Sequence, residues 1–155
     1  MRSSTQKHRI GIAELTFFLI GLILLLLLAT VANGQQPLYK EYRGVRLGMT
    51  ATEARAKLGE PVMKSNEQDY YVLSATETTQ LVYDADQKVV TISTDYVGGV
   101  GAPDYKSVVG EGTLLEKPDG SLFRMVQYRS AAMWVSYHKS ATTAPVVTIT
   151  IQIMR

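Results

Sequence analysis

Two six-residue stretches, Val89-Val-Thr-Ile-Ser-Thr94 and Val146-Val-Thr-Ile-Thr-Ile151, decide how this chain folds. Both alternate apolar and hydroxyl-bearing side chains, which is the pattern of a β-strand with one buried face. In the first stretch, Val90 and Ile92 are expected to share the buried face. Because almost the same strand occurs twice in 155 residues, the sequence predicts a repeated structural unit.

A short helix is predicted ahead of the first strand region. Thr50 and Glu53 form a capping box, in which the Thr50 hydroxyl accepts from the backbone N–H of residue 53 while the Glu53 carboxylate reaches back. Gly59 can adopt the left-handed conformation that ends a helix, and Pro61 prevents its continuation. The sequence therefore predicts a helix over residues 51–58.

A second helix is predicted over residues 103–109, with Pro103 at its first position and Gly110 just after its end. It resembles the first helix in its ending, because Val109-Gly110-Glu111 repeats the form of Leu58-Gly59-Glu60. The same kind of helix ending thus precedes both strand regions.

The remaining pattern predicts six strands joined by short turns. They cover residues 69–74, 78–84, 88–96, 121–129, 132–138 and 145–154. Consecutive strands with short turns favour antiparallel pairing, and helices separated from runs of strands favour the α+β class. We therefore predict an α+β fold of two tandem helix-plus-three-strand units, about 44–96 and 98–154. Their sheets are expected to form a curved surface with the short helices on one face.

Residues 1–34 differ from the rest and are interpreted as a signal peptide or signal anchor, an N-terminal hydrophobic export helix. Arg2, Lys7 and Arg9 precede an uncharged apolar run over residues 15–32. That run lies between the length of a cleavable segment and the roughly 17–25 residues of a spanning helix. Small residues before Gln35 would permit cleavage there, so cleavage and retention both stay open.

Either alternative predicts a periplasmic or extracytoplasmic location for the remainder, because basic residues hold the amino-terminal end inside. If residues 15–32 are retained, they would anchor the protein in the inner membrane. Residues 35–43 are polar and are predicted to be a tether to a domain at 44–155. Beyond residue 34 the basic and acidic residues balance, which gives no electrostatic argument for a nucleic acid partner.

The sequence predicts no catalytic residue, no metal site and no cofactor. The only histidines are His8 and His138, and the chain has no cysteine, so a zinc site lacks ligands. No nucleophile-elbow pattern accompanies His138. Asp69 lies close to Glu67, but nothing in the sequence gives these two carboxyl groups different environments, which acid–base catalysis requires. We therefore expect a protein that is not an enzyme.

Aromatic side chains are the best candidates for contacts with a partner. Trp134, Tyr71 and Tyr137 lie in predicted strands, and aromatic anchors dominate many protein interfaces. Alternation places Trp134 on the face opposite Met133 and Tyr137. The alternative is that these residues are good strand formers that cover a core.

The stretch from Gly44 to Pro61 resembles the opening motif of the SmpA/OmlA (BamE-like) envelope domains. Gly48-Met49-Thr50 and Leu58-Gly59-Glu60-Pro61 match the family's Gly-Met-Thr, helix and Leu-Gly-x-Pro pattern. That family is typically lipidated at a cysteine and has one helix–sheet unit, and this chain has no cysteine. A doubled unit is more similar to the β-lactamase inhibitor protein superfamily, which grips a protein with its curved sheet.

The resemblance implies an exported, non-enzymatic protein-interaction module of the cell envelope, acting in outer-membrane assembly or as an inhibitor. Its partner would be another envelope protein. The alternative is a single-pass, membrane-anchored domain with a structural or sensory role outside the cytoplasm.

Overall fold

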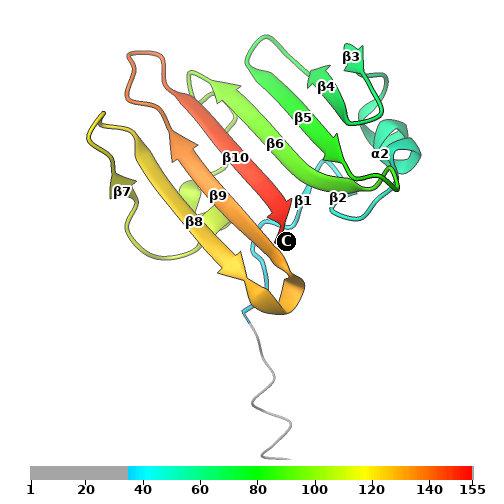
Figure 1. Cartoon of the computed structure of the whole chain (residues 1–155). Coiled ribbons are helices and arrows are strands. Elements are labelled where there is room, and N and C mark those ends of the chain that lie inside the picture. Colours follow the sequence, from blue (N-terminus) through cyan, green and yellow to red (C-terminus); the bar gives the residue numbers. More distant parts are fainter. Residues whose placement is uncertain (1–34, 155) are drawn as a thin grey trace, which may run out of the picture. The chain divides into compact units, whose positions relative to one another are not determined.

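Strands β6 (Val89–Val97) and β10 (Val146–Ile153) lie side by side at the centre of an eight-stranded antiparallel sheet (Figure 1). The computed structural model describes residues 35–154. The two stretches that carry the strongest strand pattern thus form the middle of the domain. Ile92 lies directly opposite Ile151 across this pair, and both side chains are buried.

Three strands flank the central pair on each side, in the order β3-β4-β5-β6-β10-β9-β8-β7. Their bounds are β3 Met63–Lys64, β4 Gln68–Val72, β5 Glu77–Tyr83, β7 Leu115–Glu116, β8 Leu122–Tyr128 and β9 Met133–Lys139. The predicted α+β class and antiparallel pairing are confirmed. The two-residue outer strands are too short to have a sequence pattern, so the sequence did not reveal β3.

Helix α2 (Ala51–Leu58) has the predicted bounds and the predicted capping box. The Glu53 backbone N–H donates to the Thr50 hydroxyl, and the Thr50 N–H donates to the Glu53 carboxylate at 2.8 Å. Gly59 ends the helix with a φ of 86°. Both hydrogen bonds of the predicted capping box are therefore present, while Gly59 combines its positive φ with an extended ψ of −163° and not with the predicted left-handed helical conformation.

Helix α3 (Tyr105–Val109) begins two residues later than predicted. The Asp104 carboxylate accepts from the Lys106 N–H at 2.9 Å, so Asp104 caps the helix. Pro103 lies before the cap and is not the first helical residue. A short 3-10 turn, η2 (Arg129–Ala131), joins β8 to β9.

The predicted tether over residues 35–43 is in part a structured element. β1 (Glu41–Tyr42) and β2 (Val45–Arg46) form a hairpin whose turn residues Arg43 and Gly44 both have positive φ. Tyr42 is 4% exposed, and its hydroxyl donates to the Glu77 carboxylate at 2.6 Å. Burial and this carboxylate raise the pKa of Tyr42 to about 12. The hairpin is thus fastened to β5.

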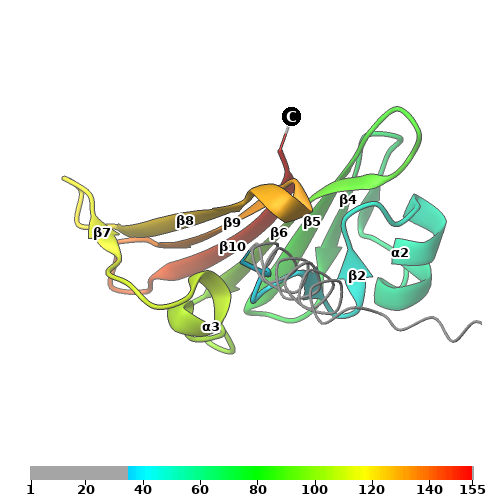
Figure 2. The same cartoon turned by 90° about the horizontal axis from the view of Figure 1, so that it is seen from below.

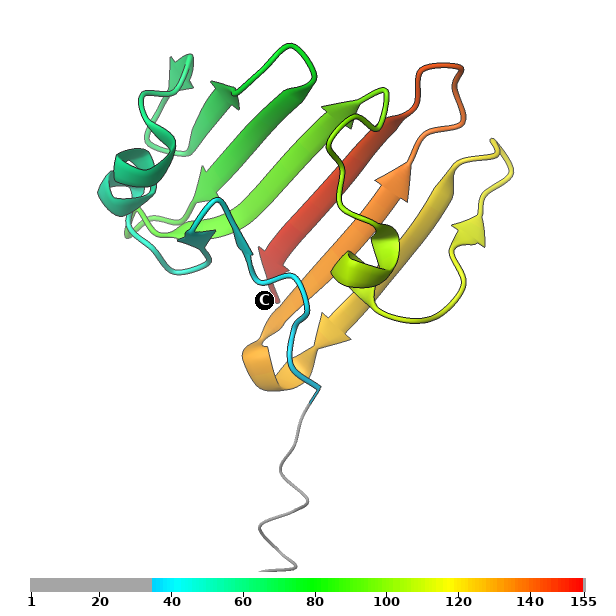
Figure 3. The ribbon, with the colours of Figure 1, turned by 180° about the vertical axis from the view of Figure 1, so that it is seen from behind.

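The two faces of the sheet have different surroundings. Both helices and the β1–β2 hairpin lie on one face, and no helix of residues 35–154 lies on the opposite face (Figures 2 and 3). Side chains of the covered face form a continuous apolar core with those of the helices and hairpin, including Val45, Ala54, Leu81, Ile92, Val108, Val135, Ile149 and Ile151. Within residues 35–154, the core therefore lies on one side of the sheet.

A β-bulge corrects one prediction about the first strand. Val82 pairs with Thr91, but Tyr83 pairs with Val89, so Val90 is an extra residue on β6. Val89 joins the buried core, whereas Val90 lines a depression on the face away from the helices. Val90 therefore does not share a face with Ile92, because the bulge reverses the alternation before Thr91.

The predicted export segment, residues 1–34, lies outside the described residues. Within residues 35–154, neither helix has the length and apolar character needed to cross a membrane.

Candidate functional site

The sheet face without helices is the best candidate for a functional surface, and we name it the open face. Cross-strand registers place side chains from all eight strands on it. From β4 across to β8 they include Tyr70, Val72, Thr78, Gln80, Val82, Thr91, Ser93, Asp95, Thr148, Thr150, Gln152, Trp134, Ser136, His138, Phe123, Met125 and Gln127. This is a broad sheet surface built by alternate residues of every long strand.

The centre of the open face is polar, and its side chains bond one another. The hydroxyls of Ser93 and Thr150 are 3.2 Å apart across the β6–β10 pair. The Thr148 hydroxyl donates to the Asp95 carboxylate at 2.6 Å. These cross-strand hydrogen bonds give the hydroxyl groups and the Asp95 carboxylate partners within the sheet itself.

Exposed apolar side chains surround this polar centre. Among residues 35–154, five of the eight exposed large apolar side chains lie on the open face: Met63, Val72, Val97, Leu115 and Met125. Their exposed fractions range from 44% to 69%. They come from five different strands, β3, β4, β6, β7 and β8, so the exposed apolar surface is distributed over the face.

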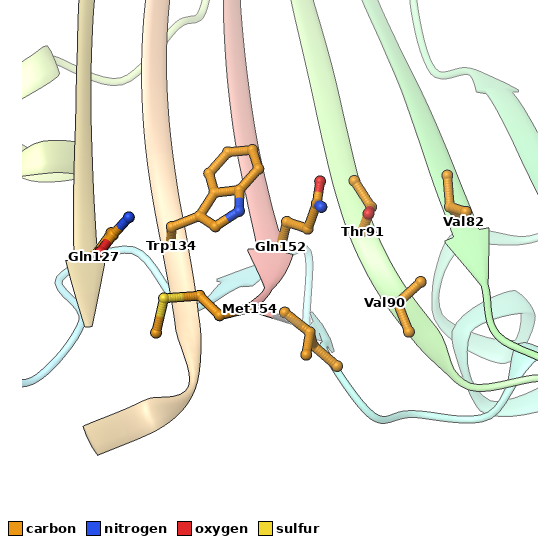
Figure 4. A pocket seen from close by; sticks show the side chains of 8 residues that line it. Val82, Val90, Thr91, Gln127, Trp134, Gln152 and Met154 are labelled. Carbon is orange, nitrogen blue, oxygen red and sulfur yellow. The ribbon is translucent and has the colours of Figure 1, made fainter. Parts of the chain in front are cut away.

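A shallow depression of about 560 Å³ lies on the open face near the carboxyl-terminal end of β10 (Figure 4). Five strands contribute to its lining, which comprises Val82, Val90, Thr91, Gln127, Trp134, Gln152, Ile153 and Met154. Trp134 is its largest side chain and is partly exposed. The predicted opposition of Trp134 to Met133 and Tyr137 is confirmed, since Met133 and Tyr137 are buried in the core.

The other two predicted anchors, Tyr71 and Tyr137, lie on the covered face. Tyr71 is 2% exposed and Tyr137 is 7% exposed, so neither ring is available to a partner. Tyr137 packs against Tyr105 of α3, with ring centroids 6.2 Å apart. Burial and the neighbouring Asp69 raise the pKa of Tyr71 to about 12. Both tyrosines act as core residues, which corrects the prediction of binding roles for them.

Asp69 is the centre of a buried polar cluster beneath α2. Its side chain is fully buried and accepts two hydrogen bonds from the Arg55 guanidinium, at 2.7 and 3.0 Å. The hydroxyls of Tyr83 and Tyr71 also donate to it, at 2.6 and 3.3 Å. Burial raises the pKa of Asp69, but these donors outweigh burial and hold its pKa below the usual range. The cluster fastens α2 to the sheet.

The described residues bring together no group of three acidic or histidine side chains that could hold a metal ion. His138 lies on the open face between Phe123 and Thr148, and Ser136 precedes it on the same face. Asp84 stabilises the turn between β5 and β6, because its carboxylate accepts from the N–H groups of Asp86 and Lys88.

Sequence reasoning identified Trp134 but not the side chains around it. Gln127, Gln152 and Val82 belong to different strands, and they become neighbours only through the pairing of β8, β9, β10, β6 and β5. The alternation in residues 145–154 contained the signal that Gln152 faces away from Ile151. No local sequence pattern predicts the strand register that pairs Gln152 with Trp134.

Comparisons of this chain with protein-family models, with curated proteins and with solved structures found no match.

Proposed function

We propose that this protein is an exported, non-enzymatic interaction module of the cell envelope that binds another envelope protein through its open face. The observation that supports this proposal most is the open face itself, where Trp134 and exposed apolar side chains surround a self-bonded polar centre. A face of this kind can bury aromatic and aliphatic side chains against a partner without leaving polar groups unpaired. The resemblance of residues 44–61 to SmpA/OmlA domains favours the same function.

We further propose that the domain consists of two copies of one unit, about 44–96 and 98–154, following an export segment. Each proposed unit has a helix that ends at a glycine with positive φ, Gly59 or Gly110. Four antiparallel strands follow each helix, one more than the three expected from the sequence. The last strands of the two units, β6 and β10, pair with each other. Two equivalent halves joined in this way give a sheet twice as wide as one unit could supply.

The second candidate function is a membrane-anchored structural or sensory domain outside the cytoplasm. The length of the apolar run over residues 15–32 favours it, because that run reaches the lower limit for a spanning helix. Sequencing the amino terminus of the mature protein separates the alternatives. A terminus at Gln35 excludes the anchor, and an intact Arg2 supports it.

Replacing Trp134 by Ala is expected to weaken partner binding at least about tenfold, because truncating a central aromatic anchor often costs 2 kcal/mol or more. The partner is first identified by photo-crosslinking in cells from a benzoylphenylalanine placed at Thr91 on the open face. The affinity of the purified partner is then measured by calorimetry with the parent protein and the Trp134→Ala variant.

The matched control is Lys57→Ala, an exposed substitution on α2 on the other side of the sheet. It should leave the affinity unchanged within error. Crosslinks that form from position 57 but not from position 91 would contradict open-face docking, as would turnover of a small substrate by the purified protein.

A further inference from the structure

The outer side of β8 is a sheet edge that its neighbouring strand covers at one end only. β7 pairs with Leu122 and Phe123, and it does not continue along the rest of β8 (Figure 1). On the opposite edge of the sheet, residues 62–65 bond β4 through Val62 N–H to Tyr70 and Ser65 N–H to Gln68, each at 2.9 Å. The two edges of the sheet are therefore covered to different extents.

Backbone hydrogen bonds identify which groups of β8 point outward. The Met154 N–H bonds the Ala132 carbonyl and the Ser140 N–H bonds the Val146 carbonyl, so even-numbered residues of β9 bond toward β10. The backbone groups of odd-numbered residues of β9 therefore point toward β8. These residues pair with even-numbered residues of β8 such as Arg124 and Val126, whose backbone groups point back toward β9. Met125 and Gln127 consequently direct their N–H and carbonyl groups away from the sheet.

The segment that would cover this edge is held elsewhere by Arg124. If β7 extended backwards in register, Thr113 would lie opposite Met125 and Glu111 opposite Gln127. Instead the Arg124 guanidinium donates to the carbonyls of Glu111 at 2.8 Å and Thr113 at 3.5 Å. The same guanidinium also reaches the Val109 carbonyl at 3.3 Å.

Gly112 permits this close approach. A Cβ atom at residue 112 would lie 2.0 Å from Arg124 Nη1, and the φ of 129° is one that other residues rarely adopt. The connection between α3 and β7 therefore bows outward from β8 (Figures 1 and 3). The sequence thus contains a device, Arg124 with Gly112, that keeps the connection off the Met125–Gln127 edge.

We propose that the β8 edge over residues 124–128 binds an extended segment of the partner protein as an additional strand. The outward N–H and carbonyl groups of Met125 and Gln127 match the backbone of an extended peptide, and no other common ligand presents that alternation. Met125 is 44% exposed, and Gln127 lines the depression beside Trp134. Apolar side chains of the added strand would lie over the open face next to these residues.

A second copy of this chain is a poorer occupant. Antiparallel pairing of two β8 edges, with Met125 opposite Gln127 of the other copy, sets Phe123 opposite Arg129. β7 occupies the place beside Phe123, and Arg129 begins the η2 turn. β7 of one copy and η2 of the other would therefore occupy the same space. This clash favours an extended segment of another protein over a second copy of this chain.

This inference depends on the proposed function in one respect, that the ligand is a polypeptide. Its test uses a peptide of defined sequence. The probe is a capped peptide of about seven alternating Val and Thr residues, and its control carries N-methyl groups on alternate amides. Amide exchange of the full-length, nitrogen-15-labelled protein is followed by NMR with and without each peptide. We expect fast exchange at Met125 and Gln127 in the free protein, slow exchange at Val126, and slowing at Met125 and Gln127 with the unmethylated peptide alone.

Gln127→Pro should weaken peptide binding at least about tenfold, because it removes an outward donor and fills the edge. Proline is tolerated there because this N–H does not bond β9. The matched variant Gln127→Ala removes the side chain but keeps the N–H, so it should weaken binding much less than Gln127→Pro does. Protection of Met125 and Gln127 in the free protein, by a second copy or by the chain itself, would overturn the proposal, as would peptide protection at any other edge.

This result is separable from the proposed function. Trp134→Ala should lower affinity for the whole partner without changing the exchange of the Met125 amide. If the peptide fails to bind while Trp134→Ala still weakens partner binding, the edge proposal is wrong and open-face docking stands.

Discussion

Replacing Asp69 by Asn is expected to lower the free energy of unfolding by about 3 kcal/mol, because breaking a buried ion pair leaves the other charge uncompensated. Arg55 would keep its positive charge against the sheet, with only 19% of its side chain exposed. The hydroxyls of Tyr83 and Tyr71 would lose a charged acceptor as well. Urea denaturation monitored by circular dichroism measures the change.

The effect should depend on pH in a definite direction. The pKa of Asp69 is lower in the folded protein than its usual value, so folding favours the ionised form. Its contribution is fully present above the unfolded-state pKa of about 4 and is lost as the pH falls through the folded-state pKa. The difference between parent and variant should therefore be constant from pH 5 to neutral pH and shrink below about pH 4.

Glu67→Gln is the matched control, since Glu67 is an exposed carboxylate two residues away. It should change stability by no more than about 0.5 kcal/mol. Equal effects of the two substitutions would show that the buried cluster contributes no more than a surface charge does.

Replacing Ile151 by Ala is expected to cost about 3–4 kcal/mol, because it removes a buried aliphatic side chain and leaves a cavity. Ile151 is fully buried and lies between Ile92 on β6 and Val135 on β9. The cavity would open at the junction of the two halves of the sheet, where strands on both sides constrain relaxation. The midpoint and slope of urea unfolding measure the loss.

Thr150→Val on the same strand is the control. Its side chain lies on the open face, and the change removes one half-exposed hydrogen bond to Ser93. The expected cost is about 1 kcal/mol or less. A cost for Thr150→Val equal to that for Ile151→Ala would contradict the assignment of the two faces.

Local signals in the sequence accounted for most individual elements. The alternation in residues 145–154 predicted β10 within one residue at each end, and the capping box predicted α2. These signals succeed because strand alternation and helix capping depend on residues close in sequence. The prediction that Trp134 lies on the face opposite Met133 and Tyr137 succeeded for the same reason.

Contacts between distant residues were not predictable in this way. Asp69 and Glu67 looked equivalent, yet only Asp69 lies within reach of the Arg55 side chain, which extends from α2. The β1–β2 hairpin was not predicted, because its strands have two residues each. Its turn also places Arg43 at a positive φ of 47°, and arginine is not a residue that signals such a turn. Tyr71 and Tyr137 were misassigned because alternation shows that two faces differ without showing which one the helices cover.

The central claim is that a partner occupies the open face in the protein's native setting. Because the chain has no cysteine, single cysteines can report on each face separately. Gln152→Cys places a thiol in the depression beside Trp134, and Lys57→Cys places one on α2. The rate of maleimide labelling is measured for each variant in cells and for each purified variant.

We predict that labelling at position 152 is about tenfold slower in cells than in the purified protein, as expected for a face occupied about nine-tenths of the time. Labelling at position 57 should be the same in both settings. Equal rates at position 152 in the two settings, or protection at position 57 instead, would contradict the account.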